Sequence, residues 1–351
     1  MSRVIFINRY FYPDHSATSQ ILGDLAFKLA SEGHEVHVLT SRQIYDQPDA
    51  RLAPEEWIDG VAIHRVQTTR YGRSNLAGRV VDYLSFYLSI GQKLAALTGP
   101  GDIVVAKTDP PLTSLPAAAI ARRRGAHLVN WLQDLYPEVA IELGVPFLSG
   151  RAGAAMKLTR NWSLRVASAN VVLGNAMAER LRDCGVETAR IHVIPNWTDD
   201  RTLQPVPVES NPLRTSWKLN GKFVIGYSGN LGRAHEFETV LAAAVELRNE
   251  CDIVFLCIGG GRQFAELGRR VETERLDAAF RFIPYQDRAI LQHSLGVPDV
   301  HLDFDASLSR GAHLPKQILR NRSRGATGDR VDRQPWRNRR SRPYTRDRCG
   351  D

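Results

Sequence analysis

Two loops in the second half of the chain carry residue types that suit the binding of diphosphates and sugars. In the first loop, Gly229 and Asn230 tolerate positive φ and let the backbone approach a ligand closely. Arg233 follows at the start of a predicted helix, where the positive end of the helix dipole disfavours a cation unless an anion is also bound. The pattern predicts an anion-binding loop, with a plain tight turn as the alternative.

The second loop is the run Gly259, Gly260 and Gly261, which follows an apolar segment. Three consecutive glycines let the backbone approach a diphosphate or a sugar ring. The run is not the GxGxxG pattern of nicotinamide-binding proteins and the chain has no P-loop motif, so neither a dehydrogenase nor a P-loop NTPase is favoured. A later loop at Tyr285 and Gln286 has a backbone able to hold the edge of a nucleobase, although taken alone it is an ordinary connection.

The first half of the chain offers two further loops. Ser16 and Ala17 open a predicted helix, whose N–H groups and dipole suit a phosphate; an ordinary N-cap is the alternative. Asp134 and Glu138 follow a buried strand, where a carboxylate can act as a general base or accept a hydrogen bond from an acceptor hydroxyl. Here the alternative is a helix cap with proline in the first turn.

These loops can act together only if the strands before them end at the same edge of a sheet. Residues 1–198 alternate short apolar strands with helical segments, and the alternation returns in 223–302 after a proline-rich linker at 199–222. Strands that are apolar throughout are typical of parallel sheets buried on both faces. The predicted fold class is α/β, with two Rossmann-like, doubly wound domains facing a cleft, the second one incomplete. The predicted strands are 3–8, 35–40, 61–65, 102–106, 127–131, 169–173, 191–194, 223–228, 252–258, 280–283 and 300–302, and the predicted helices are 18–32, 76–97, 112–124, 151–167, 175–184, 235–248, 262–275 and 287–294.

The last segment, 303–351, shows no hydrophobic periodicity. The net charge of +8 comes from this end, because 13 of the 46 Lys and Arg but only 4 of the 38 acidic residues lie in 310–351. A basic surface over the whole protein, such as nucleic-acid binding requires, is therefore not expected. One interpretation is that the tail is disordered. The other is that it is read out of frame, because a domain should not end halfway through its sheet.

The segment 76–97 is unusually apolar and aromatic. It is predicted to be a core helix, with an interfacial helix that touches a membrane as the alternative. No run of about 18 apolar residues is present to span a bilayer, and the N-terminus shows no secretory leader. We therefore expect a cytoplasmic protein, peripheral on the inner face of the plasma membrane if the helix is interfacial.

Taken together, five segments resemble family 4 glycosyltransferases of the GT-B type, and within them the group that builds colanic acid, O-antigen and other bacterial exopolysaccharides. The resemblance covers residues 1–302 and rests on order and spacing rather than on any single motif. The segments are Phe-Tyr-Pro at 11–13, Gln-Asp-Leu-Tyr-Pro-Glu at 133–138, Val-Ile-Pro-Asn-Trp at 193–197, Tyr-Ser-Gly-Asn-Leu-Gly-Arg at 227–233 and Ile-Gly-Gly-Gly at 258–261.

The resemblance implies a hexosyltransferase that moves a sugar from a nucleotide-diphosphate donor with retention at the anomeric carbon. The acceptor would be a glycan linked to a polyprenyl diphosphate at the inner membrane surface, in the synthesis of exopolysaccharide or lipopolysaccharide. No cofactor, metal or nucleic-acid partner is expected. Cationic groups and backbone dipoles would stabilise the departing diphosphate.

The resemblance also assigns roles to the residues named above. Gly229, Asn230 and Arg233 would face the donor diphosphate, Gly259 to Gly261 would line the donor pocket, Tyr285 and Gln286 would lie near the base, Ser16 and Ala17 would approach the diphosphate from the acceptor-side domain, and Asp134 would act on the acceptor. The family often has two glycines where this chain has Ser16 and Ala17.

The chain departs from the family beyond residue 302, where the family places the carboxylate that meets the donor sugar and the helix that closes the sheet. A one-nucleotide slip with permitted synonymous codons lets 311–330 read P-S-K-F-Y-G-I-A-A-A-G-R-P, which resembles the family's donor-domain motif. We therefore predict a frameshift near this boundary and an inactive or impaired chain.

Two other functions remain as alternatives. A nucleotide-sugar epimerase on the same scaffold would invert its sugar without an acceptor. A nucleic-acid binder with a basic tail would bind with steep salt dependence that disappears when 310–351 is deleted.

Overall fold

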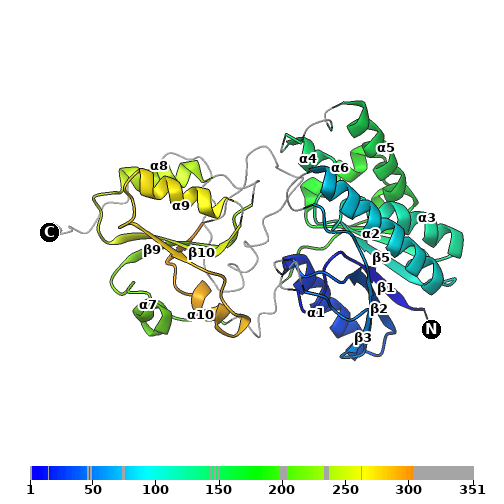
Figure 1. The fold of residues 1–351 in the computed structure, drawn as a ribbon, viewed down its shortest axis with the longest axis horizontal. Coiled ribbons are helices and arrows are strands. Elements are labelled where there is room, and N and C mark those ends of the chain that lie inside the picture. Colours follow the sequence, from blue (N-terminus) through cyan, green and yellow to red (C-terminus); the bar gives the residue numbers. More distant parts are fainter. Residues whose placement is uncertain are drawn as a thin grey trace. The chain divides into compact units, whose positions relative to one another are not determined.

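The computed structural model describes residues 2–302 except 15, 46, 48–49, 73–75, 143, 146–147, 149, 198–203, 233–236 and 262. The described residues form two compact units, one ending at Trp197 and one beginning at Gln204 (Figure 1). The expectations for the tail, 303–351, lie outside the described residues.

The first unit is built on an eight-stranded sheet with the order β3-β4-β2-β1-β5-β6-β7-β8. Every pairing is parallel except that of the edge strand β3 with β4. The order of the strands reverses on the two sides of β1, as in a doubly wound sheet. The strands are β1 (Val4–Ile7), β2 (Val36–Ser41), β3 (Glu55–Ile58), β4 (Val61–Val66), β5 (Ile103–Lys107), β6 (His127–Trp131), β7 (Ala169–Val172) and β8 (Ile191–Val193). The helices are α1 (Ala17–Ser31), α2 (Leu76–Leu97), α3 (Ser114–Arg124), α4 (Glu138–Glu142), α5 (Arg151–Val166) and α6 (Asn175–Asp183).

The side chains of successive β1 residues pack on opposite faces of this sheet. Ile5 and Ile7 belong to the core cluster that includes residues of α2 and α3, whereas Phe6 belongs to the cluster that includes α1. Side chains of a strand alternate between faces, so an apolar run fills two cores at once. Helices α2, α3 and α5 lie beside one another on one face (Figure 1).

The helix α2 confirms the prediction for 76–97 and adds a detail. Asp82, Phe86, Ile90 and Leu94 are buried at four-residue spacing, so one stripe of the helix faces the core. Leu88 is 70% exposed on the other side. None of the described helices combines the length and the apolar character needed to cross a membrane.

The second unit has a parallel four-stranded sheet with the order β11-β10-β9-β12. Apolar residues of β9 and β10 pack on both faces, against the helices in one cluster and against the α7 region in another. Its elements are α7 (Pro212–Ser216), β9 (Phe223–Asn230), α8 (Glu238–Glu246), β10 (Ile253–Gly260), α9 (Phe264–Thr273), β11 (Phe280–Ile283), α10 (Leu291–Leu295) and β12 (Val300–His301).

Part of the segment expected to be a linker is built into this second unit. Arg214 on α7 is buried and forms an ion pair with Asp299 at 2.5 Å. Asn211 caps α7 through the Leu213 N–H and donates to the carbonyl of His293. Residues 211–222 are therefore a packed part of the second unit, and of the expected linker only 199–203 lies outside the described residues.

At the amino edge of the first sheet, Asp102 ties the start of β5 to the start of β1. Its carboxylate accepts from the Gly99 N–H at 2.8 Å, the Arg3 N–H at 3.1 Å and the Arg3 guanidinium at 2.9 Å. Burial opposes the charged form, but these hydrogen bonds outweigh it and lower the pKa of Asp102.

A folded-state pKa below the unfolded value of about 3.9 stabilises the protein above that pH, and the contribution is lost as the pH falls through the folded-state pKa. Asp102→Asn should therefore lower the free energy of unfolding by about 1–3 kcal/mol near neutral pH. The difference from the parent should shrink between pH 5 and pH 3. Urea unfolding across this range measures it, with the exposed Asp277→Asn as the control. A difference that stays constant with pH would refute the assignment.

Candidate functional site

In the second unit, the two predicted glycine loops lie side by side at the carboxyl edge of the sheet. Gly229 pairs with Gly259 and Asn230 pairs with Gly260 in the register of β9 and β10. The Leu231 N–H donates to the Gly260 carbonyl at 2.7 Å. Ligands of open α/β sheets bind outside the carboxyl ends of the strands, so this edge is the candidate donor site.

Two of these glycines are required by the backbone. Gly259 has φ +129°, and a Cβ there would lie 2.1 Å from the Gly229 carbonyl oxygen. Gly261 has φ +122°, and a Cβ there would lie 2.5 Å from Asn230 Oδ1. The loops approach each other more closely than any side chain permits, so they present bare backbone at the sheet edge.

The loop after β11 reaches the same place. The Tyr285 ring is 57% exposed and lies 3.1 Å from the position that a Cβ on Gly260 would take. Gln286 is turned back on its own loop, where its Nε2 donates to the Pro284 carbonyl at 2.8 Å. The structure therefore brings the ring of Tyr285, but not the amide of Gln286, to the glycine loops. Arg233 lies outside the described residues.

In the first unit, Ser16 occupies the N-cap position of α1, but its hydroxyl makes no capping hydrogen bond. Its backbone N–H donates instead to Asp14 Oδ1 at 2.8 Å, and Asp14 Oδ2 accepts from the Tyr45 N–H at 2.6 Å. The alternative of a side-chain cap at Ser16 is therefore wrong. Ala17 is exposed at the first turn of the helix.

Asp134 and Glu138 follow β6 and have different surroundings. Asp134 is half-buried, and burial together with the Asp134 charge raises the pKa of Tyr136. Glu138 forms an ion pair with the buried Arg160 at 2.6 Å. This pairing gives Glu138 a structural role and makes it a weaker candidate than Asp134 for binding the acceptor hydroxyl. Because α4 begins only at Glu138, Asp134 is not its N-cap and remains the acceptor-side candidate.

A group of aromatic and charged side chains around Arg9, in the loop after β1, was not predicted from the sequence. The Arg9 guanidinium lies 5.2 Å from the centre of the Tyr10 ring and 5.3 Å from that of Tyr83. Burial raises the pKa of both phenols, and the Asp109 charge adds to it. Both hydroxyls therefore stay protonated at neutral pH. Tyr83 lies on α2. The apolar pattern of this helix gave no signal that Tyr83 would contact Arg9.

Two buried amides join the loop after β6 to the segment after β8. Gln133 Nε2 donates to Asn196 Oδ1, and Asn196 Nδ2 donates to Gln133 Oε1, each at 3.1 Å. Beside them the rings of Trp131 and Trp197 stack at 5.5 Å, and Lys107 Nζ lies 3.7 Å from the centre of the Trp131 ring. Asn196 thus has a structural partner.

Within the described part of the chain, no group of three or more His, Cys, Asp or Glu side chains gathers in a way that could hold a metal ion.

The chain is similar to proteins that transfer sugars. It is 25% identical over 320 residues to a putative colanic acid biosynthesis glycosyl transferase, WcaI, of Escherichia coli strain K12, covering 88% of this chain and 78% of the relative. A sucrose-phosphate synthase from Thermosynechococcus elongatus superposes with a TM-score of 0.64 at 14% identity, covering 86% of this chain and 75% of the other. HepE of Anabaena, solved in complex with UDP-glucose, superposes with a TM-score of 0.57 at 13% identity, covering 86% and 73%.

These structural neighbours share the GT-B fold, which agrees with two Rossmann-like units. The model of the glycosyl transferase 4-like domain matches residues 17–197, more than half of the chain. The chain therefore belongs to the glycosyl transferase 4-like family and is a glycosyltransferase of the GT-B type.

Proposed function

We propose that this glycosyltransferase moves a hexose, with retention, from a nucleotide-diphosphate donor to a glycan carried on a polyprenyl diphosphate in cell-surface polysaccharide synthesis. The observation that carries the donor assignment is the meeting of the glycine-bearing ends of β9 and β10 beside the Tyr285 ring. Similarity to a protein named for colanic acid biosynthesis and to a structure that contains UDP-glucose supports the choice of substrates.

In this proposal the bare backbone around Gly229 and Gly259 lies against the donor diphosphate, and Arg233 supplies positive charge. Tyr285 lies beside the base. The transfer needs stabilisation of the charge that develops on the leaving diphosphate, which fixed dipoles and a cation provide without reorganisation. We propose that this step needs no metal, with backbone dipoles and Arg233 as the proposed source of positive charge.

On the acceptor side, Asp134 would accept a hydrogen bond from the hydroxyl that attacks the sugar. Ser16 and Ala17 would present the first turn of α1 to the diphosphate, because its N–H groups are not capped by the Ser16 side chain.

A negative charge added to the donor loop tests whether the glycine loops bind the donor diphosphate. Asn230→Asp keeps the shape of the side chain but places a carboxylate at the proposed diphosphate site. It should weaken binding of UDP, GDP or ADP, whichever the parent binds best, by about 10-fold or more, which is 1.4 kcal/mol. Asn249→Asp, an exposed change in the loop that precedes β10, is the matched control. Titration calorimetry gives the dissociation constants, and equal affinities for Asn230→Asp and the parent would contradict the donor site.

We further propose that the chain as written transfers sugar poorly, because the family's donor carboxylate is placed beyond residue 302. Sequencing the gene across codons 300–312 tests for a frameshift. A chain repaired there should show transfer at least about 100-fold faster than the 351-residue chain, a difference of roughly 2.7 kcal/mol in barrier. Product NMR then reports the anomeric configuration. Equal transfer rates for the two chains would contradict the proposed impairment. A product with inverted anomeric configuration would contradict the proposed retaining mechanism.

We also propose that the face formed by α2 and α3 rests on the inner membrane. Leu84 and Leu88 are exposed on α2, and a groove of about 520 Å³ beside Leu88 includes Arg123 and Arg124 of α3 among its lining residues. Exposed apolar side chains next to basic ones suit the interface of an anionic bilayer.

The double variant Leu84→Gln with Leu88→Gln should therefore bind vesicles of phosphatidylglycerol and phosphatidylcholine about 10-fold more weakly than the parent, because two apolar side chains no longer enter the interface. Trp57→Gln, which removes an exposed ring on the edge strand β3, is the control. Co-sedimentation measures the bound fraction, and unchanged binding of the double variant would exclude this face.

A further inference from the structure

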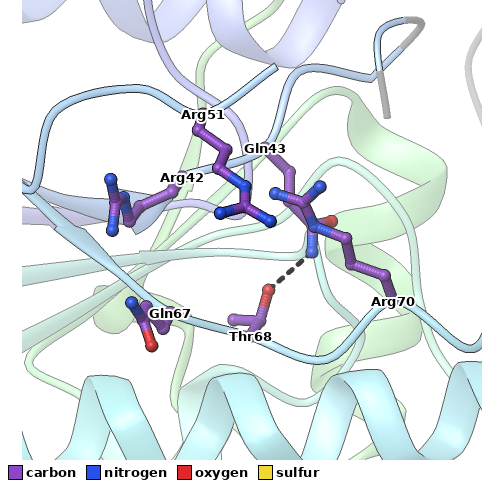
Figure 2. A pocket seen from close by; sticks show the side chains of 6 residues that line it. All are labelled: Arg42, Gln43, Arg51, Gln67, Thr68 and Arg70. Carbon is purple, nitrogen blue, oxygen red and sulfur yellow. Dashed lines mark hydrogen bonds between the residues drawn. The ribbon is translucent and has the colours of Figure 1, made fainter. Parts of the chain in front are cut away.

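A cavity that none of the assigned roles uses lies at the carboxyl edge of the first sheet. It has a volume of about 340 Å³, and its lining residues are Arg42, Gln43, Arg51, Gln67, Thr68 and Arg70. Ligand pockets begin at about 300 Å³, so this cavity suits a small group rather than a whole substrate. In Figure 2 the guanidinium groups of Arg51 and Arg70 both extend into the space above Thr68, with Arg42 to one side.

Strand register explains why distant residues meet here. Ser41, the last residue of β2, pairs with Val66, the last residue of β4. The segments that follow these two strands therefore leave the sheet together. The Arg42 N–H donates to the Val66 carbonyl at 3.2 Å and extends this pairing into the wall of the cavity.

The floor of the cavity is fixed by hydrogen bonds. The buried Gln43 donates through Nε2 to Thr68 Oγ1 at 2.8 Å and to the Thr69 carbonyl at 3.1 Å (Figure 2). Arg42 Nε donates to the Leu52 carbonyl at 2.7 Å, which orients its guanidinium group.

The wall that carries Arg70 is held by Asp82 of α2. This carboxylate is 3% exposed. It accepts from Thr69 Oγ1 at 2.7 Å, the Tyr71 N–H at 2.9 Å and the Gly72 N–H at 2.8 Å. Three bonds to one buried carboxylate fix the segment on both sides of Arg70.

The charge of the cavity is one-sided. Three of its six lining residues are arginines, and none of the lining residues is acidic among the part of the chain that the structure describes. Guanidinium groups bind phosphate oxygens through paired, charge-assisted hydrogen bonds. A diphosphate carries two or more negative charges in a compact group, which matches three arginines better than a single carboxylate does.

We propose that the cavity of Arg42, Arg51 and Arg70 binds the diphosphate group of the acceptor. This inference rests on the proposed function, in which the acceptor is a glycan on a polyprenyl diphosphate. All the residues that line the cavity belong to the first unit, whereas the glycine loops belong to the second. It provides a point of attachment for the acceptor that does not depend on which sugars the acceptor carries.

Titration of the full chain with inorganic pyrophosphate tests the site. Arg51 is exposed and donates no hydrogen bond to any described residue, so Arg51→Gln should leave the thermal unfolding midpoint unchanged. It should weaken pyrophosphate binding about 10-fold, and Arg42→Gln combined with it should weaken binding further. Arg122→Gln on α3, an exposed change of equal charge, should have no effect. Pyrophosphate affinity that is the same in Arg51→Gln, the double variant and the parent would overturn the proposal.

Binding of pyrophosphate at the glycine loops can be distinguished from binding in the cavity. Asn230→Asp should weaken binding at the glycine loops, and Arg51→Gln should leave that binding unchanged. A second arm uses vesicles of phosphatidylglycerol. If Arg51→Gln weakens vesicle binding but not pyrophosphate binding, the arginines contact lipid head groups and the proposal is wrong.

In transfer assays that use the chain repaired beyond residue 302 and a polyprenyl-diphosphate acceptor, Arg51→Gln should raise the KM for the acceptor about 10-fold and leave the KM for the donor unchanged. If Arg51→Gln loses pyrophosphate binding while neither the 351-residue chain nor the chain repaired beyond residue 302 transfers sugar, the anion site stands and the proposed function fails. If sugar transfer proceeds with an unchanged acceptor KM in Arg51→Gln, the proposed function stands and the anion site fails.

Discussion

Parallel pairing of β1 with β2 on one side and β5 on the other places the chemistry of the first unit at one edge of its sheet. The loop after β1 is bound to both neighbours, because the Arg9 N–H donates to the Asp109 carbonyl at 2.7 Å and the Arg9 carbonyl accepts from the Ser41 N–H and hydroxyl. These bonds leave the loops little freedom to separate. The aromatic group around Arg9, the arginine cavity and the first turn of α1 all depend on this shared edge.

The regular elements were largely predictable, because strands buried on both faces are apolar throughout and the helices between them are amphipathic. The helix 76–97 and the strands 127–131 and 280–283 match their predicted bounds. The edge strand β3 was missed because Glu55, Glu56 and Trp57 are exposed, so its sequence gives no burial signal. The short helix α7 was missed because prolines and polar residues dominate its segment, although Asn211 before Pro212 is a recognisable helix start.

The candidate site was predictable only in part. The glycine loops are visible in the sequence because positive φ and close backbone approach demand glycine. The arginine cavity is less visible, since Arg42, Arg51 and Arg70 are spread over two loops and combine only through the register of β2 and β4. The signal in the sequence is that polar residues follow the buried strands 35–40 and 61–65, because residues after neighbouring parallel strands gather at one edge of the sheet.

The reciprocal amide pair of Gln133 and Asn196 limits how this protein can evolve. Each side chain is both donor and acceptor to the other in a buried place. Changing one of them to a residue without an amide leaves the other with unsatisfied groups, at a cost of about 1–3 kcal/mol. Replacing both with apolar residues of similar shape avoids that cost. Among descendants of this sequence, positions 133 and 196 should therefore change together or remain as they are.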